Sequence, residues 1–455
     1  MQCELTIEAL GAGGDGIARR DGAKLFVPGA LPGERVRADL GRAAGGGTVA
    51  RVLERLTDSP ARAAPTCEYF GACGGCVAQH IAARPYAEWK VAVIREALAH
   101  RGMTDIAMAP LIVSPRASRR RARLAVARRH VTPGGAPGGE VVLGFRRRRS
   151  HDITAIERCA VLLPALEALL HPLRGLVAEI GGGVAEISLT RAHEGIDVIL
   201  HGIKAPLSMA TRETLAGFTQ SHGIQRLSVE SPAAGGAGKR KRRPAPTLET
   251  IVQPGAVRAW FAGVAVDAPP GAFLQPTAAG EAAIQRLVRA GLAAHELAPR
   301  KAGARIADLY AGLGGIGFAL ATGGGGDRAG GHRVAMFEGS AAMAGAAQAA
   351  ARRAGVNVTA QARDLARRPL GSDELKPYDA VIFDPPRAGA RAQVEALAAS
   401  QVARIAAVSC HAASFARDAR ILTDGGYRLS ALTPIDQFLW SSHVELVAIF
   451  QRGGG

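Results

Sequence analysis

Residues 304–317 read ARIADLYAGLGGIG, and this stretch decides the fold of the C-terminal part of the chain. It joins a short apolar run to a glycine-rich turn, where glycine permits positive φ and lets the backbone approach a ligand closely. From about residue 267 onward, strand-like and helix-like segments alternate, which is typical of a parallel, doubly wound sheet. We therefore predict an α/β domain over residues 267–455.

The ends of the predicted strands carry chemically useful side chains. Strands are expected at residues 304–310, 332–340, 356–364, 378–386, 404–410, 427–437 and 442–452, and helices at 281–297, 341–355 and 412–426. Ligands of such sheets bind beyond the carboxyl ends of the strands. That edge would carry residues 308–317, Glu338, Asp364, Asp384 and Cys410.

The first 266 residues show a different organisation. Short strand-like runs between glycine-rich turns predict a small barrel of the OB type over residues 1–58, and such barrels often bind single-stranded nucleic acid. Residues 59–266 read as a mixed α+β central domain, with helices expected over 87–102 and 163–181. Residues 231–247 are rich in glycine, proline and basic residues, which predicts a mobile basic loop.

The chain of 455 residues carries a formal net charge of +17. Its arginines gather in SRRRAR (118–123), FRRRRSH (145–151) and GKRKRR (238–243). Such clusters favour a polyanionic partner, so we expect binding to nucleic acid, and charge alone does not distinguish RNA from DNA. We see no apolar run of about 18 residues and no secretory signal, which predicts a cytoplasmic protein without a membrane span.

Three of the six cysteines lie close together in CEYFGACGGC, residues 67–76. Disulfides are rare in the cytoplasm, so these thiols are expected to be metal ligands or catalytic groups. The spacing C-x5-C-x2-C leaves both zinc and an iron–sulfur cluster open, and either site would need a fourth ligand.

Several residues of the C-terminal domain allow both a functional and a structural interpretation. Cys410 would be a reactive thiolate at a helix N-terminus, or a small buried apolar group. Glu445, inside an apolar strand, would be a proton acceptor with a raised pKa, or a strand-edge residue facing water. Glu338 suits the two hydroxyls of a ribose, and the prolines of FDPPRAG (383–389) fix a rigid turn that holds Asp384.

Taken in order, the motifs resemble one known family over nearly the whole chain. GGDGIARRDGAKLFVPGALPGERV is similar to a TRAM domain, and CEYFGACGGCVAQH is similar to a cluster-binding loop. Motifs similar to the family's central domain are RRRARLAV, LGFRRRRSHDI and IERCAVL. Motifs similar to its catalytic domain follow in the family's order: GAFLQP, DLYAGLGGIG, FDPPRAG, SCHAASFARD and HVELVAIF. The family is the RNA uracil-5-methyltransferases, in the branch that contains an iron–sulfur cluster.

The resemblance implies a class I methyltransferase (Rossmann-like) fold with S-adenosylmethionine as methyl donor. The cofactor-binding positions that it implies are Gln275, Tyr310, Glu338, Asp364 and Asp384. Cys410 then matches the nucleophile that adds to carbon 6 of uracil, Glu445 matches the general base, and Asp384 also contacts the uracil. The implied partner is RNA, with 23S rRNA favoured over tRNA, and the protein is expected to act as a monomer.

The resemblance also makes the cysteine site a [4Fe-4S] cluster. Cys3 lies near the N-terminus and Cys410 at the expected active site, so the remaining thiols are Cys67, Cys73, Cys76 and Cys159, and these are the expected ligands. One departure concerns the nucleophile, because residues 409–412 read SCHA where the family usually has Ser-Cys-Asn-Pro.

Two other functions are compatible with these motifs. One is a non-catalytic RNA-binding or chaperone protein that keeps the cluster and the TRAM-like domain. The other is a cytosine-5 methyltransferase, which would also use a cysteine nucleophile.

Overall fold

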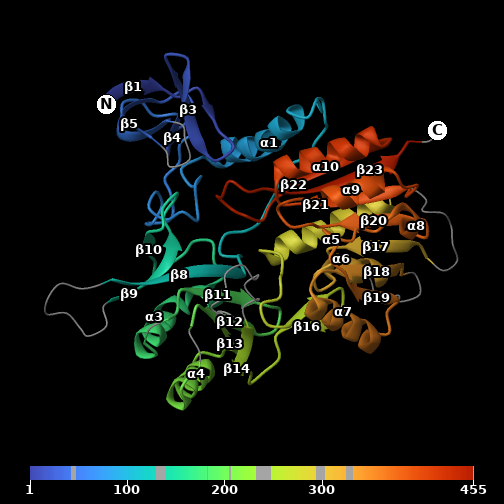
Figure 1. The fold of residues 1–455 in the computed structure, drawn as a ribbon. Helices are drawn as coiled ribbons and strands as arrows, with labels where there is room; N and C mark the ends of the chain where they lie inside the picture. Colours follow the sequence, from blue (N-terminus) through green and yellow to red (C-terminus); the bar gives the residue numbers. More distant parts are fainter. Residues whose placement is uncertain are drawn as a thin grey trace, which may run out of the picture.

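The structure is a computed structural model that describes residues 1–42, 48–129, 140–181, 183–203, 206–231, 247–293, 303–323 and 331–453. Figure 1 shows three parts that follow one another along the chain: an N-terminal β unit, a central sheet and a large C-terminal sheet covered by helices. Most of the expected basic loop at 231–247 lies outside the described residues.

The N-terminal unit is a six-stranded sheet in the order β1-β5-β6-β4-β3-β2. Its strands are β1 (Gln2–Thr6), β2 (Ala9–Leu10), β3 (Asp15–Arg20), β4 (Ala23–Pro28), β5 (Arg35–Arg42) and β6 (Thr48–Arg55). Small and branched side chains from these strands, such as Leu25, Val27 and Val36, fill its core. Short strands with glycine at the turns, including Gly14 and Gly22 at positive φ, produce the small β unit that the sequence predicts.

The central sheet has seven strands in the order β10-β9-β8-β11-β12-β13-β14. They are β8 (Arg121–Arg129), β9 (Glu140–Arg146), β10 (Ile153–Ala155), β11 (Glu186–Arg191), β12 (Ile196–His201), β13 (Arg226–Ser231) and β14 (Thr247–Val252). Helices α2 (Pro164–Glu167), α3 (Leu170–Glu179) and α4 (Met209–Ser221) accompany it. Apolar side chains of the sheet, such as Ile187 and Leu189, share one hydrophobic core with α3 and α4.

The single helix expected over residues 163–181 is two helices, because α2 ends before α3 begins. Pro172 explains the break. Proline has no backbone N–H and is tolerated only in the first turn of a helix, and Pro172 occupies the first turn of α3.

The C-terminal sheet has eight strands in the order β19-β18-β17-β20-β21-β23-β22-β7. They are β7 (Ile112–Val113), β17 (Arg305–Leu309), β18 (Arg333–Glu338), β19 (Val358–Ala362), β20 (Ala380–Phe383), β21 (Arg404–Ser409), β22 (Tyr427–Asp436) and β23 (Glu445–Arg452). Only β23 runs antiparallel to its neighbours in this described sheet. The order reverses between β17 and β20, which is where such sheets bind ligands.

Helices cover both faces of this sheet (Figure 1). One hydrophobic core takes in α5 (Ala278–Ala293), α6 (Gly315–Ala321) and α7 (Ala341–Ala354), and the other takes in α8 (Ser372–Leu375), α9 (Arg391–Ala398) and α10 (Ala412–Asp424). The predicted doubly wound α/β architecture is therefore confirmed. In the described part of the chain, no helix has both the length and the apolar character that crossing a membrane requires.

Three segments within residues 83–267 pack with the C-terminal sheet. Helix α1 (Ala83–Ala99) places Ile94 and Leu98 in the same core as α9 and α10, and β7 pairs with the edge strand β22. The hairpin β15 (Arg258–Phe261) and β16 (Val264–Asp267) contributes to the core beneath α6 and α7. The C-terminal sheet is thus completed by segments on both sides of the central sheet in sequence.

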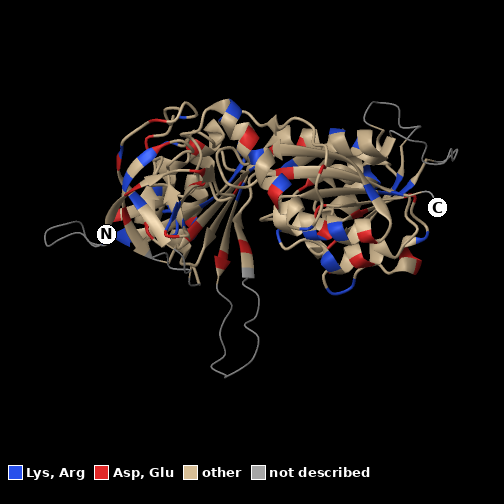
Figure 2. Cartoon of the chain, turned by 90° about the horizontal axis from the view of Figure 1, so that it is seen from above, with Lys and Arg blue, Asp and Glu red and all other residues tan. Residues whose placement is uncertain are grey.

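Part of the arginine content holds the molecule together. Arg148 and Arg149 both reach Asp15 of the N-terminal unit, at 2.6 and 2.8 Å, and Arg120 pairs with buried Glu281 at 2.8 Å. Figure 2 shows that basic and acidic residues are interspersed along the ribbon in both halves of the molecule. Some arginines of the basic runs 118–123 and 145–151 therefore form ion pairs between units of the protein and are not all available to a polyanionic partner.

Candidate active site

A cavity of about 1070 Å³ opens at the carboxyl edge of the C-terminal sheet and extends to the central sheet. Its lining includes every residue predicted for the cofactor and for catalysis, namely Gln275, Tyr310, Glu338, Asp364, Asp384, Cys410 and Glu445. The structure therefore brings these seven residues, which span 170 positions of sequence from 275 to 445, to one cavity.

The glycine-rich turn after β17 forms one end of the cavity. Gly312 and Gly314 have φ of 59° and 90°, and Tyr310 shares this left-handed conformation at 59°. At Gly317 an added Cβ would lie 2.8 Å from Asp308 Oδ2, so only glycine fits there without displacing the acid. The turn thus holds the N-terminus of α6 tightly against the strand that it follows.

Glu338 accepts two backbone hydrogen bonds at the end of β18. The N–H of Gly312 donates to Oε2 at 2.9 Å, and the N–H of Ser340 donates to Oε1 at 2.8 Å. These contacts fix the carboxylate beside the glycine-rich turn. Its remaining lone pairs can accept from hydroxyl groups, which is the role expected of an acid that binds a ribose.

Asp308 is fully buried next to this turn, and one of its oxygens, Oδ2, has no hydrogen-bond partner in the described residues. Burial, with the nearby charges of Asp384 and Glu338, raises the pKa of Asp308 to about 8. The group therefore binds a proton at neutral pH in the ligand-free protein.

Asp364 and Tyr310 line the same end of the cavity. Asp364 follows β19, and its Oδ1 accepts the backbone N–H groups of Ala366 and Arg367 at 3.1 and 3.3 Å. Burial raises the pKa of Tyr310 to about 12, so its hydroxyl stays protonated. Asp364 therefore contributes a carboxylate, and Tyr310 an aromatic ring, to the lining of the cavity that also contains Glu338.

A chain of side-chain hydrogen bonds joins Asp384 to Glu445. The amide nitrogen of Gln275 donates to Asp384 at 2.7 Å. The amide nitrogen of Gln437 donates both to Gln275 Oε1, at 2.8 Å, and to Glu445 Oε2, at 2.6 Å. Two glutamines therefore fix the relative positions of two carboxyl groups, one directly after β20 and the other at the start of β23.

Both carboxyl groups are more basic than usual. Burial and the charge of Asp384 raise the pKa of Glu445, and burial likewise raises the pKa of Asp384. The hydrogen bond from Gln437 opposes the rise at Glu445. Glu445 Oε1 is buried and unpartnered among the described residues, so this oxygen is free to take up a proton.

Cys410 lies between the end of β21 and the start of α10. Burial and the charges of Glu445 and Asp384 raise the pKa of its thiol to about 11, while the guanidinium of Arg387 acts in the opposite direction. The free protein therefore holds a thiol that becomes a thiolate more readily when the negative charges nearby are neutralised.

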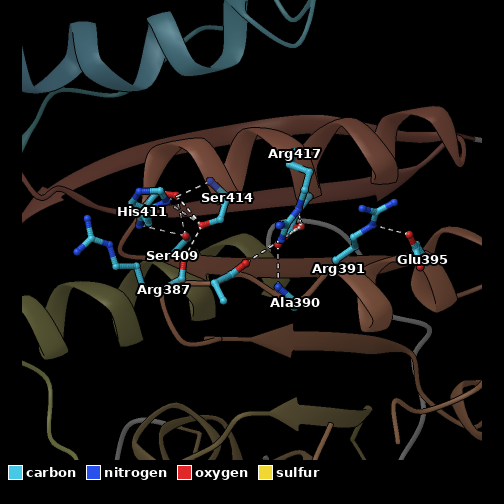
Figure 3. Close-up of polar contacts among 10 residues, drawn as sticks. Arg387, Ala390, Arg391, Glu395, Ser409, His411, Ser414 and Arg417 are labelled. Atoms are coloured by element: carbon cyan, nitrogen blue, oxygen red, sulfur yellow. Dashed lines mark hydrogen bonds and ion pairs between the residues drawn. The ribbon is translucent and has the colours of Figure 1, made fainter. Parts of the chain in front are cut away.

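His411 caps the helix that follows the cysteine, as Figure 3 shows. Its Nδ1 accepts the backbone N–H of Ser414 at 3.3 Å, and the Ser409 hydroxyl accepts the N–H of His411 at 3.3 Å. An asparagine at this position would cap in the same way through its side-chain oxygen. The change to histidine therefore preserves the helix start directly after the thiol.

The turn that carries Asp384 is fastened to the same helix (Figure 3). The Ser414 hydroxyl donates to the carbonyl of Arg387 at 3.1 Å, and Arg417 donates to the carbonyl of Ala388 at 3.0 Å. Asp418 accepts the N–H of Ala390 at 2.9 Å. Helix α10 thus sets the distance between the loop of the thiol and the loop of the acid.

The cysteines of residues 67–76 lie with Cys159 around a second cavity of about 400 Å³. Burial raises the pKa of Cys73, Cys76 and Cys159, in the case of Cys76 to about 12, and the other thiols of the group add to each rise. In the described ranges, no three His, Cys, Asp or Glu side chains surround the position of a single metal ion. The two cavities share Arg119, Ala122, Arg123 and Phe438.

The sequence did not single out Gln437, Arg387 or the capping role of His411. Gln437 ends the predicted strand 427–437 and lies eight residues before Glu445. A polar amide at the end of an apolar strand, close to an acid on the next strand, is the available signal. Arg387 directly follows Pro385 and Pro386 of the rigid turn.

Comparison with known proteins agrees with this arrangement. Residues 2–46 match the TRAM domain. Along 98% of this chain and 99% of its own, a crystal structure of the Pyrococcus abyssi tRNA (uracil-54, C5)-methyltransferase with S-adenosyl-L-homocysteine has the same fold, with a TM-score of 0.70 and 20% sequence identity. The chain therefore shares the fold of that methyltransferase, including a doubly wound C-terminal domain.

Relatives in sequence define the family more specifically than the fold does. An uncharacterized RNA methyltransferase of Caulobacter vibrioides is 38% identical over 99% of this chain and 100% of its own length. The 23S rRNA (uracil(1939)-C(5))-methyltransferase RlmD of Halomonas elongata is 32% identical over 99% of this chain and 89% of its own. The chain belongs to the RNA methyltransferase family that includes these proteins.

Proposed function

We propose that this RNA methyltransferase transfers a methyl group from S-adenosylmethionine to carbon 5 of a uridine in RNA. The observation that carries the proposal is the position of Cys410 in one cavity with two carboxyl groups that Gln275 and Gln437 join. A thiol and a proton acceptor at one pocket are the two groups that this chemistry requires. The relatives named as uracil-C5 methyltransferases support the same choice.

The residues divide the reaction between them. The Cys410 thiolate adds to carbon 6 of uracil, which turns the ring into an enolate and makes carbon 5 nucleophilic. Carbon 5 would then take the methyl group of S-adenosylmethionine, whose S–CH3 bond breaks to leave S-adenosylhomocysteine. Glu445 accepts the proton of carbon 5, and the Cys410–carbon 6 bond breaks to release the thiolate. The target base has to leave its stack to reach the cavity.

The cofactor-binding residues fit the parts of S-adenosylmethionine. Glu338 offers oxygens for the ribose hydroxyls, and Tyr310 and Asp364 line the cavity next to it. Asp384 and Gln275 are joined by a hydrogen bond and line the same cavity as Cys410, in which a methyl donor and a uracil would meet. We therefore assign these five residues to cofactor binding and Asp384 also to the uracil.

A covalent trap tests the mechanism. RNA that contains 5-fluorouridine keeps a fluorine where the proton would leave, so the adduct persists and migrates as a protein–RNA band under denaturing conditions. We expect the adduct in the wild type and in Cys3→Ala, the matched control in the N-terminal unit, and none in Cys410→Ala. An adduct in Cys410→Ala, or none in the wild type, would refute the mechanism.

For the substrate we propose 23S rRNA, with tRNA as the alternative. The support is that the RlmD relatives are 23S rRNA methyltransferases, whereas the structural relative is a tRNA methyltransferase. Nucleoside analysis and mapping in a deletion strain test the choice. Loss of one 5-methyluridine from 23S rRNA is expected, loss from tRNA would favour the alternative, and loss of 5-methylcytidine instead would identify a cytosine enzyme.

We also propose that Cys67, Cys73, Cys76 and Cys159 hold a [4Fe-4S] cluster. Each iron of such a cluster takes one thiolate, so four cysteines around a cavity fit it without converging on one ion. The protein would act as a cytoplasmic monomer. Iron and sulfide analysis of anaerobically purified protein should give four of each per chain, and Cys159→Ser should lower both. Zinc in place of iron would contradict the proposal.

A further inference from the structure

The central sheet turns a polar face toward the large cavity. Ile187 and Leu189 of β11 belong to the core that the sheet shares with α3 and α4. Side chains alternate between the faces of a strand, so Ser188 and Thr190 lie on the opposite face, where both line the cavity. Neither residue belongs to the catalytic set.

Ser188, His201 and Glu230 form a hydrogen-bonded row across three adjacent strands of this face. Ser188 Oγ lies 2.7 Å from His201 Nε2, and His201 Nδ1 lies 2.6 Å from Glu230 Oε2. His201 and Glu230 are direct partners in the parallel pairing of β12 and β13. All three residues line the cavity.

The order of donors in the row follows from its acid end. An ionised carboxylate only accepts hydrogen bonds, so His201 carries its proton on Nδ1 and donates to Glu230. In the neutral form of the ring, Nε2 is an acceptor, and the Ser188 hydroxyl donates its proton to it. Since the Ser188 hydroxyl proton is used in this hydrogen bond, only the lone pairs of its oxygen remain available to a ligand in the cavity, and Ser188 acts as an acceptor.

A serine, a histidine and an acid in this order are also found in hydrolases. The position of Ser188 within the sheet is incompatible with that function. Acyl transfer needs free backbone N–H groups near the serine to hold the oxyanion. Ser188 lies on an interior strand, paired with Arg123 on one side and Ile199 on the other. The N–H groups of that strand are used within the sheet, so the row serves binding.

The surrounding charge indicates the ligand. Arg119 and Arg121 line the same cavity and donate to backbone carbonyls at 3.0 and 2.9 Å. No carboxylate in the described part of the chain neutralises either charge by an ion pair. Arg123, beside Ser188, is joined to Glu186. Arg119 and Arg121 line the same cavity as Cys410, and their two guanidinium groups suit the phosphodiester strand of an RNA whose target base enters the active site.

We propose that Ser188, held as an acceptor by His201 and Glu230, binds a hydrogen-bond donor of the RNA next to the target nucleotide. The donor is a ribose 2′-hydroxyl or an exocyclic amino group of a base, the two kinds of donor that an unpaired RNA strand offers most freely. This inference rests on the proposed function and adds a specificity-determining residue outside the catalytic domain.

The first test measures RNA affinity and turnover of the full chain. The probe is a 23S rRNA oligonucleotide that contains the uridine corresponding to position 1939 in the relatives' name. Loss of one neutral hydrogen bond should raise Kd about three- to tenfold in Ser188→Ala. Turnover at saturating RNA should not change, and Ser188→Thr should restore Kd. Ser221→Ala, at the exposed end of α4, is the control.

Salt dependence separates this contact from those of Arg119 and Arg121. The slope of log Kd against log salt should stay the same in Ser188→Ala, because no phosphate contact is removed. Arg121→Ala should lower the slope, since it removes a positive charge. An equal Kd in Ser188→Ala and the wild type, or a lowered slope in Ser188→Ala, would overturn the inference.

The second test identifies the donor. Single 2′-deoxy substitutions remove one ribose hydroxyl at a time, and inosine in place of guanosine removes one amino group. One position should weaken wild-type binding by the same factor as Ser188→Ala, with no further loss in the variant. Additive losses at every position would overturn the inference. Absence of methylation by the wild type would refute the proposed function instead, while the binding comparison would still be decided.

Discussion

The side-chain amide of Gln437 donates a hydrogen bond of 2.6 Å to the carboxyl group of Glu445, and both side chains are buried. The same nitrogen also reaches Gln275, which holds Asp384. The position of the Glu445 carboxyl group is therefore not determined by β23 alone. Its position and basicity depend on an amide from the end of β22.

Gln437→Leu should slow turnover at neutral pH by about tenfold or more, because the acceptor loses its orientation. The hydrogen bond from Gln437 lowers the pKa of Glu445, so its removal raises that pKa further. A base works only when deprotonated, and the acidic limb of the pH–rate profile should therefore move to higher pH. Profiles of the variant and of Gln361→Leu, an exposed control on β19, measure this. An unmoved limb would show that Gln437 has only a structural role.

Alkylation of Cys410 should be slow at neutral pH and increase up to about pH 11, because burial and two acids raise the pKa of the thiol. Asp384→Asn removes one of these negative charges and should speed alkylation at pH 8. Arg387→Ala removes a positive charge and should slow it. Peptide mass spectrometry after iodoacetamide treatment reads this site separately from the other thiols. Equal rates in all three proteins would contradict the electrostatic assignment.

His411→Ala should destabilise the protein by about 1 kcal/mol, because α10 loses its N-cap. The cap needs a neutral ring, since Nδ1 accepts. Burial and Arg387 lower the pKa of His411 in the folded protein, so its stabilising contribution is present above about pH 6.5 and is lost as the pH falls below that value.

His411→Asn provides the comparison, because asparagine caps a helix without titrating in this range. Urea unfolding at pH 7.5 and 5.5 should show the two proteins close together at the higher pH. At the lower pH the asparagine variant should be the more stable. The prediction fails if wild type and His411→Asn lose the same stability between the two pH values.

Lys90→Met should destabilise the protein by about 3–5 kcal/mol, because it leaves the charge of Asp436 buried without its partner. Lys90 and Asp436 are both fully buried, with the ammonium 3.0 Å from the carboxylate, and Tyr86 donates to the same acid at 2.5 Å. Adding Asp436→Asn should recover much of the loss. Lys376→Met, at an exposed position, should change the free energy of unfolding by less than about 0.5 kcal/mol in the same urea titration.

The sequence predicts the C-terminal sheet well because its signal is local. Most of its strands are short apolar runs, and a chemically useful side chain lies at or just after the carboxyl end of several of them, such as Glu338 on β18, Asp384 after β20 and Cys410 after β21. Those ends also identified the residues that line the cavity. Helix α9 went unrecognised because it has only eight residues and follows the proline turn directly.

What the sequence could not predict depends on distant contacts. Nothing in residues 83–99 indicates that their apolar face packs on α10, more than 300 residues later. Gln437 was missed because glutamine has no acid–base chemistry of its own, and its importance comes only from its two neighbours. The row on the central sheet was missed because its three members lie on separate strands.

The contact between α1 and β22 has a consequence for synthesis on the ribosome. Lys90 and Asp436 are 346 positions apart. At roughly 5–20 residues per second, the ribosome needs roughly 17 to 70 s to make the second partner after the first. During this interval α1 has emerged with its apolar face and its lysine unpartnered, while the N-terminal unit is free to fold. The nascent chain therefore depends on a strand made more than 300 residues later to supply the buried partner of Lys90.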